Sequence, residues 1–233
     1  LCTSASASAA DFPGGADAFE AELKDLAKRS RKRTVLVFGL IGLGSGAVVD
    51  HKGTVVTNAH VCAGARYAVI QWADGRSVLA ERQGIDYAAD LAILKPVDPL
   101  KESVPAFSLA PSAPVKGQWV MGAGFPGGLR TTSEPTTSLG RVLGIGGGPE
   151  TPIAFLDYSD AIRSDMAIFS GNSGGPMFDL QGRLLGINGA VDLENAITLT
   201  IPIDVVKARL RSLKDGLIVL PGNQTLRPKS NPI

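Results

Sequence analysis

From residue 34 onward, short apolar runs rich in β-branched residues alternate with polar and glycine-containing breaks. Asp74-Gly75 is a typical hairpin turn, and Gln181-Gly182 separates two further runs. Many short strands at such spacing are typical of a β-sandwich or β-barrel, so the pattern predicts an all-β fold. The expected strands are Thr34–Ile41, Tyr67–Trp72, Ser77–Arg82, Leu91–Leu94, Trp119–Gly122, Thr136–Ile145, Ala154–Tyr158, Pro176–Leu180 and Leu184–Asn188.

Two segments have helical periodicity instead. Residues 17–33 carry apolar side chains at helical spacing, which predicts an amphipathic helix that packs on the sheets. A second, short helix is expected at Asp204–Leu213, directly after Pro202. Residues 1–16 are rich in Ser and Ala before the first helix and are interpreted as a linker. The apolar positions of the first helix are Phe19, Leu23, Leu26 and Ala27.

Composition changes this picture little. The apolar run Thr34–Val49 is shorter than the about 20 residues that span a bilayer and contains several glycines, so two strands around a glycine turn are expected rather than a transmembrane segment. A net charge of +1 gives no case for a nucleic-acid partner. The basic run Lys28–Arg33 is interpreted as a solvated helix end, with anionic lipid or an acidic partner as the alternative.

Candidate chemistry begins with Gly171-Asn172-Ser173-Gly174-Gly175-Pro176. Glycine is unfavourable inside helices and strands, so a serine between glycines indicates a sharp turn that presents backbone N–H groups. Such a turn suits a nucleophilic serine whose own loop forms an oxyanion hole. The alternative is an ordinary glycine-rich turn.

The chain has two histidines, and their surroundings differ. His51 lies in the polar cluster Asp50-His51-Lys52-Gly53 and is interpreted as a solvated turn residue. His60 follows the β-branched strand of residues 53–59, where a core histidine is the alternative to a general base. A neutral imidazole can take a serine proton near physiological pH, so His60 is the candidate base.

The candidate acid is Asp90, at the start of the apolar run Leu91–Leu94. A carboxylate there is costly to bury unless a donor such as a histidine N–H satisfies it, and Asp86 is the competing position. The chain order His60, Asp90, Ser173 is the order of chymotrypsin-type triads.

Several stretches together resemble the HtrA/Deg branch of trypsin-like serine proteases, over about residues 34–205. The resemblance implies two six-stranded antiparallel β-barrels, at about 34–110 and 115–203, with an N-terminal helix and a short C-terminal helix. The protease domain would span 17–205, followed by a C-terminal helix and tail at 206–233. The stretches are residues 42–49, 57–61, 90–95, 122–128, 164–168, 184–188 and 201–203.

The resemblance also implies roles for residues. His60, Asp90 and Ser173 would form the catalytic triad in the cleft between the barrels, and Gly171-Asn172-Ser173 the oxyanion hole, with the N–H groups of Gly171 and Ser173 as donors. Six residues before the nucleophile, where trypsin-like members carry Asp, stands Ala167. Cleavage after small or aliphatic residues is therefore expected, with Ala167, Ile168 and Asn188 lining the specificity pocket. Asp165, at an offset shared with HtrA/Deg members, is expected to be structural.

Protein or peptide substrates, no metal and no other cofactor are expected. The resemblance further implies an extracytoplasmic location and a homo-oligomer, a trimer, for which Phe12 and Phe19 are weighed against simple helix packing. The sequence departs from the branch in several respects. The residues after Ile203 are too few for a PDZ domain of ordinary size, the strand Thr34–Ile41 leaves no room for a long insertion before residue 42, and Cys62 stands where an apolar residue is expected. Cys2 and Cys62 could pair in an oxidising compartment, and the Leu1-Cys2 start leaves a lipid anchor open.

Two alternatives to an active endopeptidase stay open at this point. One is a regulatory or scaffold protein on a protease fold whose site is unassembled at rest. The other is a glutamyl-endopeptidase-like enzyme, which would use a histidine in its specificity pocket, whereas no histidine follows His60 here.

Overall fold

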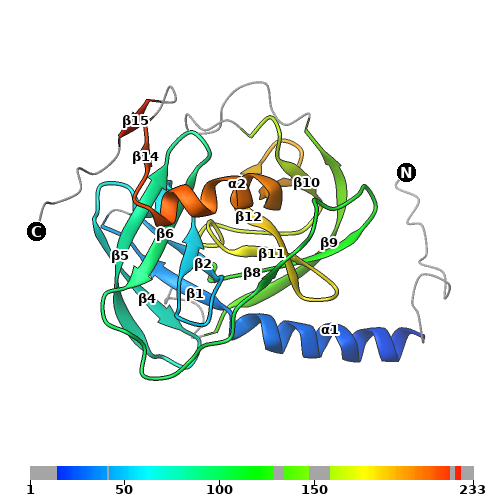
Figure 1. Cartoon of the computed structure of the whole chain (residues 1–233). Coiled ribbons are helices and arrows are strands. Elements are labelled where there is room, and N and C mark those ends of the chain that lie inside the picture. The colour runs from blue at the N-terminus through cyan, green and yellow to red at the C-terminus, as the bar shows by residue number, and fades with distance from the viewer. Residues whose placement is uncertain (1–14, 41, 128–133, 147–157, 221–223, 227–233) are drawn as a thin grey trace, which may run out of the picture.

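The computed structural model describes residues 15–40, 42–127, 134–146, 158–220 and 224–226. Cys2, Phe12 and all but the last residue of the expected strand Ala154–Tyr158 lie outside these ranges. Two β-barrels lie side by side, the first in blue and cyan and the second in green and yellow (Figure 1).

The first barrel is built from six antiparallel strands in the spatial order β5-β4-β1-β2-β3-β6, and pairing between β5 and β6 closes it. Strand β4 shows how the sequence sets the geometry: its side chains alternate between exposed and buried positions, as expected for a sheet with one face on a core. The strands are β1 (Thr34–Phe38), β2 (Leu43–Val48), β3 (Val55–Thr57), β4 (Tyr67–Trp72), β5 (Ser77–Asp86) and β6 (Leu91–Pro96).

The second barrel repeats this design in the order β11-β8-β9-β10-β13-β12, closed by pairing between β11 and β12. The predicted pair of six-stranded antiparallel barrels is therefore confirmed. Closure leaves neither barrel with an open sheet edge around its core. The strands are β8 (Trp119–Gly124), β9 (Thr136–Ile145), β10 (Ile162–Ser164), β11 (Pro176–Asp179), β12 (Arg183–Asp192) and β13 (Ile197–Pro202).

Three short strands extend the barrels. Strand β7 (Ser108–Leu109) lies parallel to β12 and follows the segment that connects the barrels. Strand β14 (Ile218–Val219) lies parallel to β5 and pairs with β15 (Thr225–Leu226). Part of the expected C-terminal tail is therefore attached to the first barrel.

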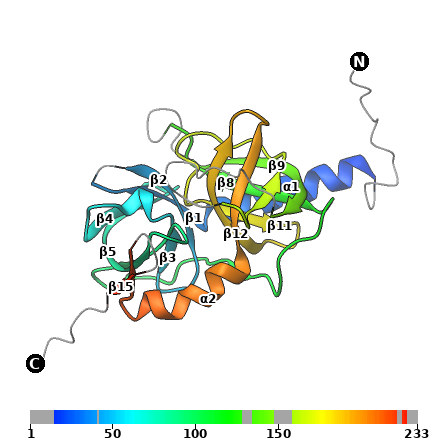
Figure 2. The ribbon, with the colours of Figure 1, turned by 90° about the horizontal axis from the view of Figure 1, so that it is seen from above.

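Both expected helices are present and shift by a residue or two at their ends. Helix α1 (Ala16–Arg31) contacts β1, β8 and β9, and Phe19 packs against Trp119 with ring centroids 6.2 Å apart. Helix α2 (Ile203–Lys214) contacts β5 and β6 of one barrel and β12 and β13 of the other, so it bridges the two (Figure 2). None of the described helices is long and apolar enough to cross a membrane.

Three apolar clusters hold the molecule together. One fills the first barrel around Val35 and Ile70, and another fills the second around Val120 and Met177. The third joins residues of both barrels with α1 and α2, and in it the rings of Phe107 and Phe178 lie 5.5 Å apart. A buried apolar layer between the barrels fixes their relative position, which a site shared by both of them requires.

Candidate active site

His60 and Asp90 of the first barrel are directly bonded. His60 opens the 3-10 turn η2 (His60–Cys62) shortly after β3. Its Nδ1 lies 2.9 Å from Asp90 Oδ2 and 3.1 Å from Oδ1, and its backbone N–H donates to Oδ1 at 3.0 Å. An Nδ1–H that donates to the carboxylate leaves Nε2 as the acceptor of the neutral ring. The imidazole side chain is 40% exposed while that of Asp90 is 3% exposed, so the base reaches solvent and the acid does not.

The competing carboxylate, Asp86, has a different task. It is fully buried and accepts the N–H groups of Ala88 and Ala89, each at 2.9 Å, in the turn that leads to Asp90. Arg209 Nε of helix α2 lies 3.0 Å from its other oxygen. Asp86 thus shapes the turn that positions Asp90. The backbone of Asp90 itself is in the left-handed region, with a φ of 50°.

Asp90 is also held from elsewhere. The side-chain amide of Asn58 donates to the Asp90 carbonyl at 3.0 Å. The hydroxyl of Tyr158, which belongs to the second barrel, donates to Asp90 Oδ2 at 2.7 Å. Burial, followed by the charge of Asp90, raises the pKa of Tyr158, so the phenol keeps its proton and remains a donor. The sequence analysis gave Tyr158 no role in the site, because a tyrosine at the end of an expected strand offers no signal of this contact.

The nucleophile loop, between β10 and β11, is fixed to the first barrel through Ser45. The Ser45 hydroxyl donates to the Gly171 carbonyl at 2.7 Å and accepts the Phe125 N–H at 2.9 Å. The Ser45 N–H donates to the Ser173 carbonyl at 2.7 Å. Gly171 has a φ of 98°, and a Cβ there would lie 2.3 Å from the Phe125 carbonyl oxygen. Only glycine therefore fits this position of the loop.

The amide groups of this loop have a defined orientation. The Ser170 carbonyl accepts the N–H of Gly127 at 2.8 Å. Because carbonyl and N–H point in opposite directions across a trans peptide, the N–H of Gly171 points away from Gly127. Across the residues that the structure describes, neither the Gly171 nor the Ser173 N–H has a hydrogen-bond partner. The N–H of Asn172 is already engaged with the Phe169 carbonyl at 2.9 Å, so Gly171 and Ser173 are the two available donors.

The Ser173 hydroxyl donates to the Gly189 carbonyl at 3.3 Å. To pass its proton to an imidazole, the hydroxyl has to leave this carbonyl. Hydrogen bonds between catalytic groups are often long or misaligned without substrate, so this arrangement is compatible with catalysis.

The residues expected around the specificity pocket occupy different environments. Ala167 is exposed and Ile168 is 7% exposed. Asn188 is fully buried, and its side chain accepts from Thr200 Oγ1 at 2.9 Å and donates to the Pro176 carbonyl at 3.3 Å. Asp165 accepts the backbone N–H of Arg141 at 2.5 Å, which is a structural contact.

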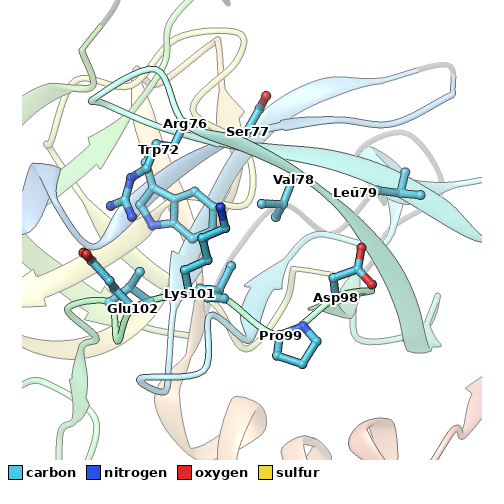
Figure 3. A pocket seen from close by; sticks show the side chains of 11 residues that line it. Trp72, Arg76, Ser77, Val78, Leu79, Asp98, Pro99, Lys101 and Glu102 are labelled. Atoms are coloured by element: carbon cyan, nitrogen blue, oxygen red, sulfur yellow. The ribbon is translucent and has the colours of Figure 1, made fainter.

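A separate pocket of about 660 Å³ lies on the first barrel (Figure 3). Its lining comes from the β4–β5 hairpin and from the loop after β6. The guanidinium of Arg76 lies over the indole of Trp72, 5.9 Å from the ring centroid, and the charged residues Asp98, Lys101 and Glu102 also line the pocket. The lining of this pocket contains no histidine, and so it lacks a general base of the kind that His60 provides.

Cys62, two residues after His60, is a buried free thiol. Burial is the main reason that the pKa of Cys62 is raised to about 12, so the thiol is protonated near neutral pH.

The class of the protein follows from comparison with known families. Residues 44–187 match the family model of the trypsin-like peptidase domain, and the chain belongs to this family. The matched stretch contains His60, Asp90 and Ser173.

Within that family, the chain is similar to a putative serine protease HhoA of Synechocystis, with 35% identity over 76% of this chain and 44% of that protein. It is also similar to a probable periplasmic serine endoprotease DegP-like of Halomonas elongata, with 38% identity over 70% of this chain and 33% of the relative. These relatives confirm the predicted resemblance to the HtrA/Deg branch. The chain spans less than half the length of both relatives.

A solved structure gives the same result. The serine endoprotease from Yersinia pestis superposes with a TM-score of 0.68 at 27% sequence identity, covering 82% of this chain and 66% of that one.

Proposed function

We propose that this protein is a serine endopeptidase in which Ser173 is the nucleophile, His60 the general base and Asp90 the group that orients the base. The observation that carries the proposal is a pair of N–H groups, on Gly171 and Ser173, that have no hydrogen-bond partner among the described residues, in a loop held against the barrel that bears the His60–Asp90 pair. Ser173 Oγ attacks a peptide carbonyl while His60 Nε2 takes its proton, and the two N–H groups stabilise the oxyanion. His60 then protonates the leaving amine, and water hydrolyses the acyl-enzyme by the same steps.

A fluorophosphonate probe tests this assignment, because an activated serine hydroxyl attacks its phosphorus and displaces fluoride, which leaves the serine phosphonylated. We expect labelling of the full chain, and loss of labelling in Ser173→Ala and in His60→Ala. Labelling of Ser173→Ala at the wild-type level would contradict the assignment.

The proposed substrates are polypeptides, cleaved after small or aliphatic residues. Ala167 stands where an acidic residue would attract a basic side chain, and the apolar Ile168 is its neighbour. A peptide-library digest is expected to show cleavage after residues such as Ala and Val. Ala167→Asp should add cleavage after Lys or Arg, and dominant cleavage after these residues by the wild type would contradict the proposal.

A specific observation favours one alternative, a regulatory protein whose site is not assembled at rest. The Ser173 hydroxyl bonds to the Gly189 carbonyl, which removes it from the base. In that case the fluorophosphonate leaves the isolated chain unlabelled while the fold, followed by circular dichroism, is intact.

We also propose an extracytoplasmic location, since several relatives are named periplasmic endoproteases. Cell fractionation tests it. A homo-trimer is proposed from the family resemblance alone, and sedimentation velocity tests it. Phe19 is only 8% exposed and packs against Trp119, so it offers little surface to another copy.

A further inference from the structure

We infer that Tyr158 is a positioning residue for the acid: its hydroxyl, supplied by the second barrel, holds the Asp90 carboxylate of the first barrel in register with His60. The inference rests on the proposed function and extends it to a residue that acts through Asp90. It is drawn from a hydrogen bond of 2.7 Å between the side chains of two buried residues, Tyr158 and Asp90.

The contacts of Asp90 explain why this hydroxyl matters. Oδ1 accepts the His60 backbone N–H at 3.0 Å, while Oδ2 faces His60 Nδ1 at 2.9 Å and the Tyr158 hydroxyl at 2.7 Å. Both carboxylate oxygens of Asp90 thus accept hydrogen bonds, and rotation of the carboxylate about the Cβ–Cγ bond would break at least one of them. A buried carboxylate needs such donors, because each one lost leaves charge without compensation in a medium of low polarity.

Space for the tyrosine is provided by Gly189. A Cβ added to Gly189 would lie 2.5 Å from both Cε1 and the hydroxyl oxygen of Tyr158, so any larger residue would displace the ring. Gly189 also accepts the Ser173 hydroxyl on its carbonyl. One glycine therefore contacts the nucleophile through its backbone and makes room for the group that holds the acid.

The other charged or titratable groups near the pair do not replace this donor. Burial is the main cause that raises the pKa of Cys62, while the charges of Arg82 and Asp90 have smaller effects, and the thiol is neutral near physiological pH. Arg82 reaches the Cys62 carbonyl at 3.5 Å rather than the carboxylate. Of the described hydroxyl groups, Tyr158 is the one bonded to Asp90.

Tyr158→Phe tests the inference, since it removes the hydroxyl and keeps the ring. A donor to a carboxylate draws off part of its charge, so without it the carboxylate stabilises the imidazolium more strongly and holds the ring less firmly. We expect the midpoint of the His60 imidazole titration to rise by about 0.5–1 pH unit and kcat to fall about tenfold at nearly constant KM.

NMR of the two histidine rings follows the titration without any need for activity. His51, whose Nδ1 bonds to the Val104 carbonyl, is the internal reference and should not move. Tyr67→Phe is the matched control, because Tyr67 is 45% exposed on β4, and it should leave kcat and both titrations unchanged.

Gly189→Ala provides a second route to the same state, by pushing the ring away from Asp90. It should raise the His60 midpoint as Tyr158→Phe does, and the double variant should give no further increase. If both variants fold and neither moves the His60 midpoint, the inference is overturned, even if thermal stability falls.

The two proposals fail in different ways. A wild-type chain that neither hydrolyses peptides nor reacts with the fluorophosphonate contradicts the proposed function, and the NMR titrations still decide the role of Tyr158. An active wild type with unchanged kcat and an unchanged midpoint in Tyr158→Phe contradicts only the inference.

Discussion

The two barrels share a topology but hold their functional groups by different means. In the first barrel, His60 and Asp90 are linked mainly through side-chain hydrogen bonds in a rigid turn that Asp86 shapes. In the second barrel, Ser173 lies on a glycine-rich loop whose carbonyl groups are held by hydrogen bonds, while the N–H groups of Gly171 and Ser173 have no partner in the part of the chain that the structure describes. A general base needs a defined ring orientation, whereas an oxyanion hole needs N–H groups that are free to bind the oxyanion. The side-chain contacts of the first barrel meet the first need, and the backbone of the nucleophile loop meets the second.

Each of these two sets of functional groups is also held by a residue of the other barrel. Ser45 of the first barrel holds the Gly171 and Ser173 carbonyls of the second, and Tyr158 of the second holds the Asp90 carboxylate of the first. Neither set of groups is therefore fully positioned until the barrels pack together. The apolar layer between the barrels is thus part of the site as well as of the fold.

The largest effect is expected from breaking the acid of the first barrel. Asp90→Asn should lower kcat by about 10⁴, because an amide that donates to His60 stabilises the wrong tautomer of the base. Steady-state hydrolysis of a peptide substrate measures this. Asp86→Asn is the matched control: its oxygen can still accept the Ala88 and Ala89 N–H groups, so its main effect should be on stability. A larger kcat loss in the control would reverse the roles given to the two aspartates.

The second effect tests the loop of the second barrel. Gly171→Ala should lower kcat by about 10²–10³, because a Cβ beside the Phe125 carbonyl forces the loop to shift and misplaces an oxyanion donor. The His60 titration should stay at its wild-type midpoint, since none of the hydrogen bonds of the Asp90 carboxylate involves Gly171. A shifted midpoint would show that the position of His60 depends on the conformation of the nucleophile loop.

A smaller effect is expected at the link between the barrels. Ser45→Ala leaves the buried Phe125 N–H without its hydroxyl acceptor and the Gly171 carbonyl without its donor, which should cost about 1–3 kcal/mol of unfolding free energy. We expect kcat to fall about tenfold, because the loop loses one of its two Ser45 contacts. Urea denaturation and kinetics on the same preparations measure both effects. Ser108→Ala, at an exposed position, is the control, and equal losses in the two variants would remove the special role of Ser45.

The smallest effect concerns the interior of the first barrel behind His60. With a pKa of about 12, Cys62 is about 10⁻⁴ thiolate at pH 8, and the reactive fraction rises only as the pH approaches that value. A thiol reagent should therefore modify Cys62 very slowly in the folded protein and rapidly after unfolding, as followed by mass spectrometry of its peptide. Rapid labelling of the folded chain at pH 8 would mean that the interior of the first barrel around Cys62 opens readily to solvent.

Much of the architecture was predictable from the sequence alone. Runs such as Tyr67–Trp72 and Thr136–Ile145 coincide with β4 and β9. In β4 the side chains alternate between exposed and buried positions, which is the pattern of a strand with one face on the core. The helix pattern at Phe19 and Leu26 was equally clear, since both face the core. Short strands such as β7 and β14 carry no pattern of their own and exist only because a partner strand lies beside them.

For the site, the sequence by itself determined the candidates His60, Asp90 and Ser173, because their local motifs stand on different elements in a chemically meaningful order. Only the tertiary structure decided which neighbours position them. Tyr158 lies 68 residues from Asp90 in sequence, and Ser45 lies 126 residues from Gly171. Contacts over such separations follow from how two closed barrels pack, and local periodicity carries no information about that packing.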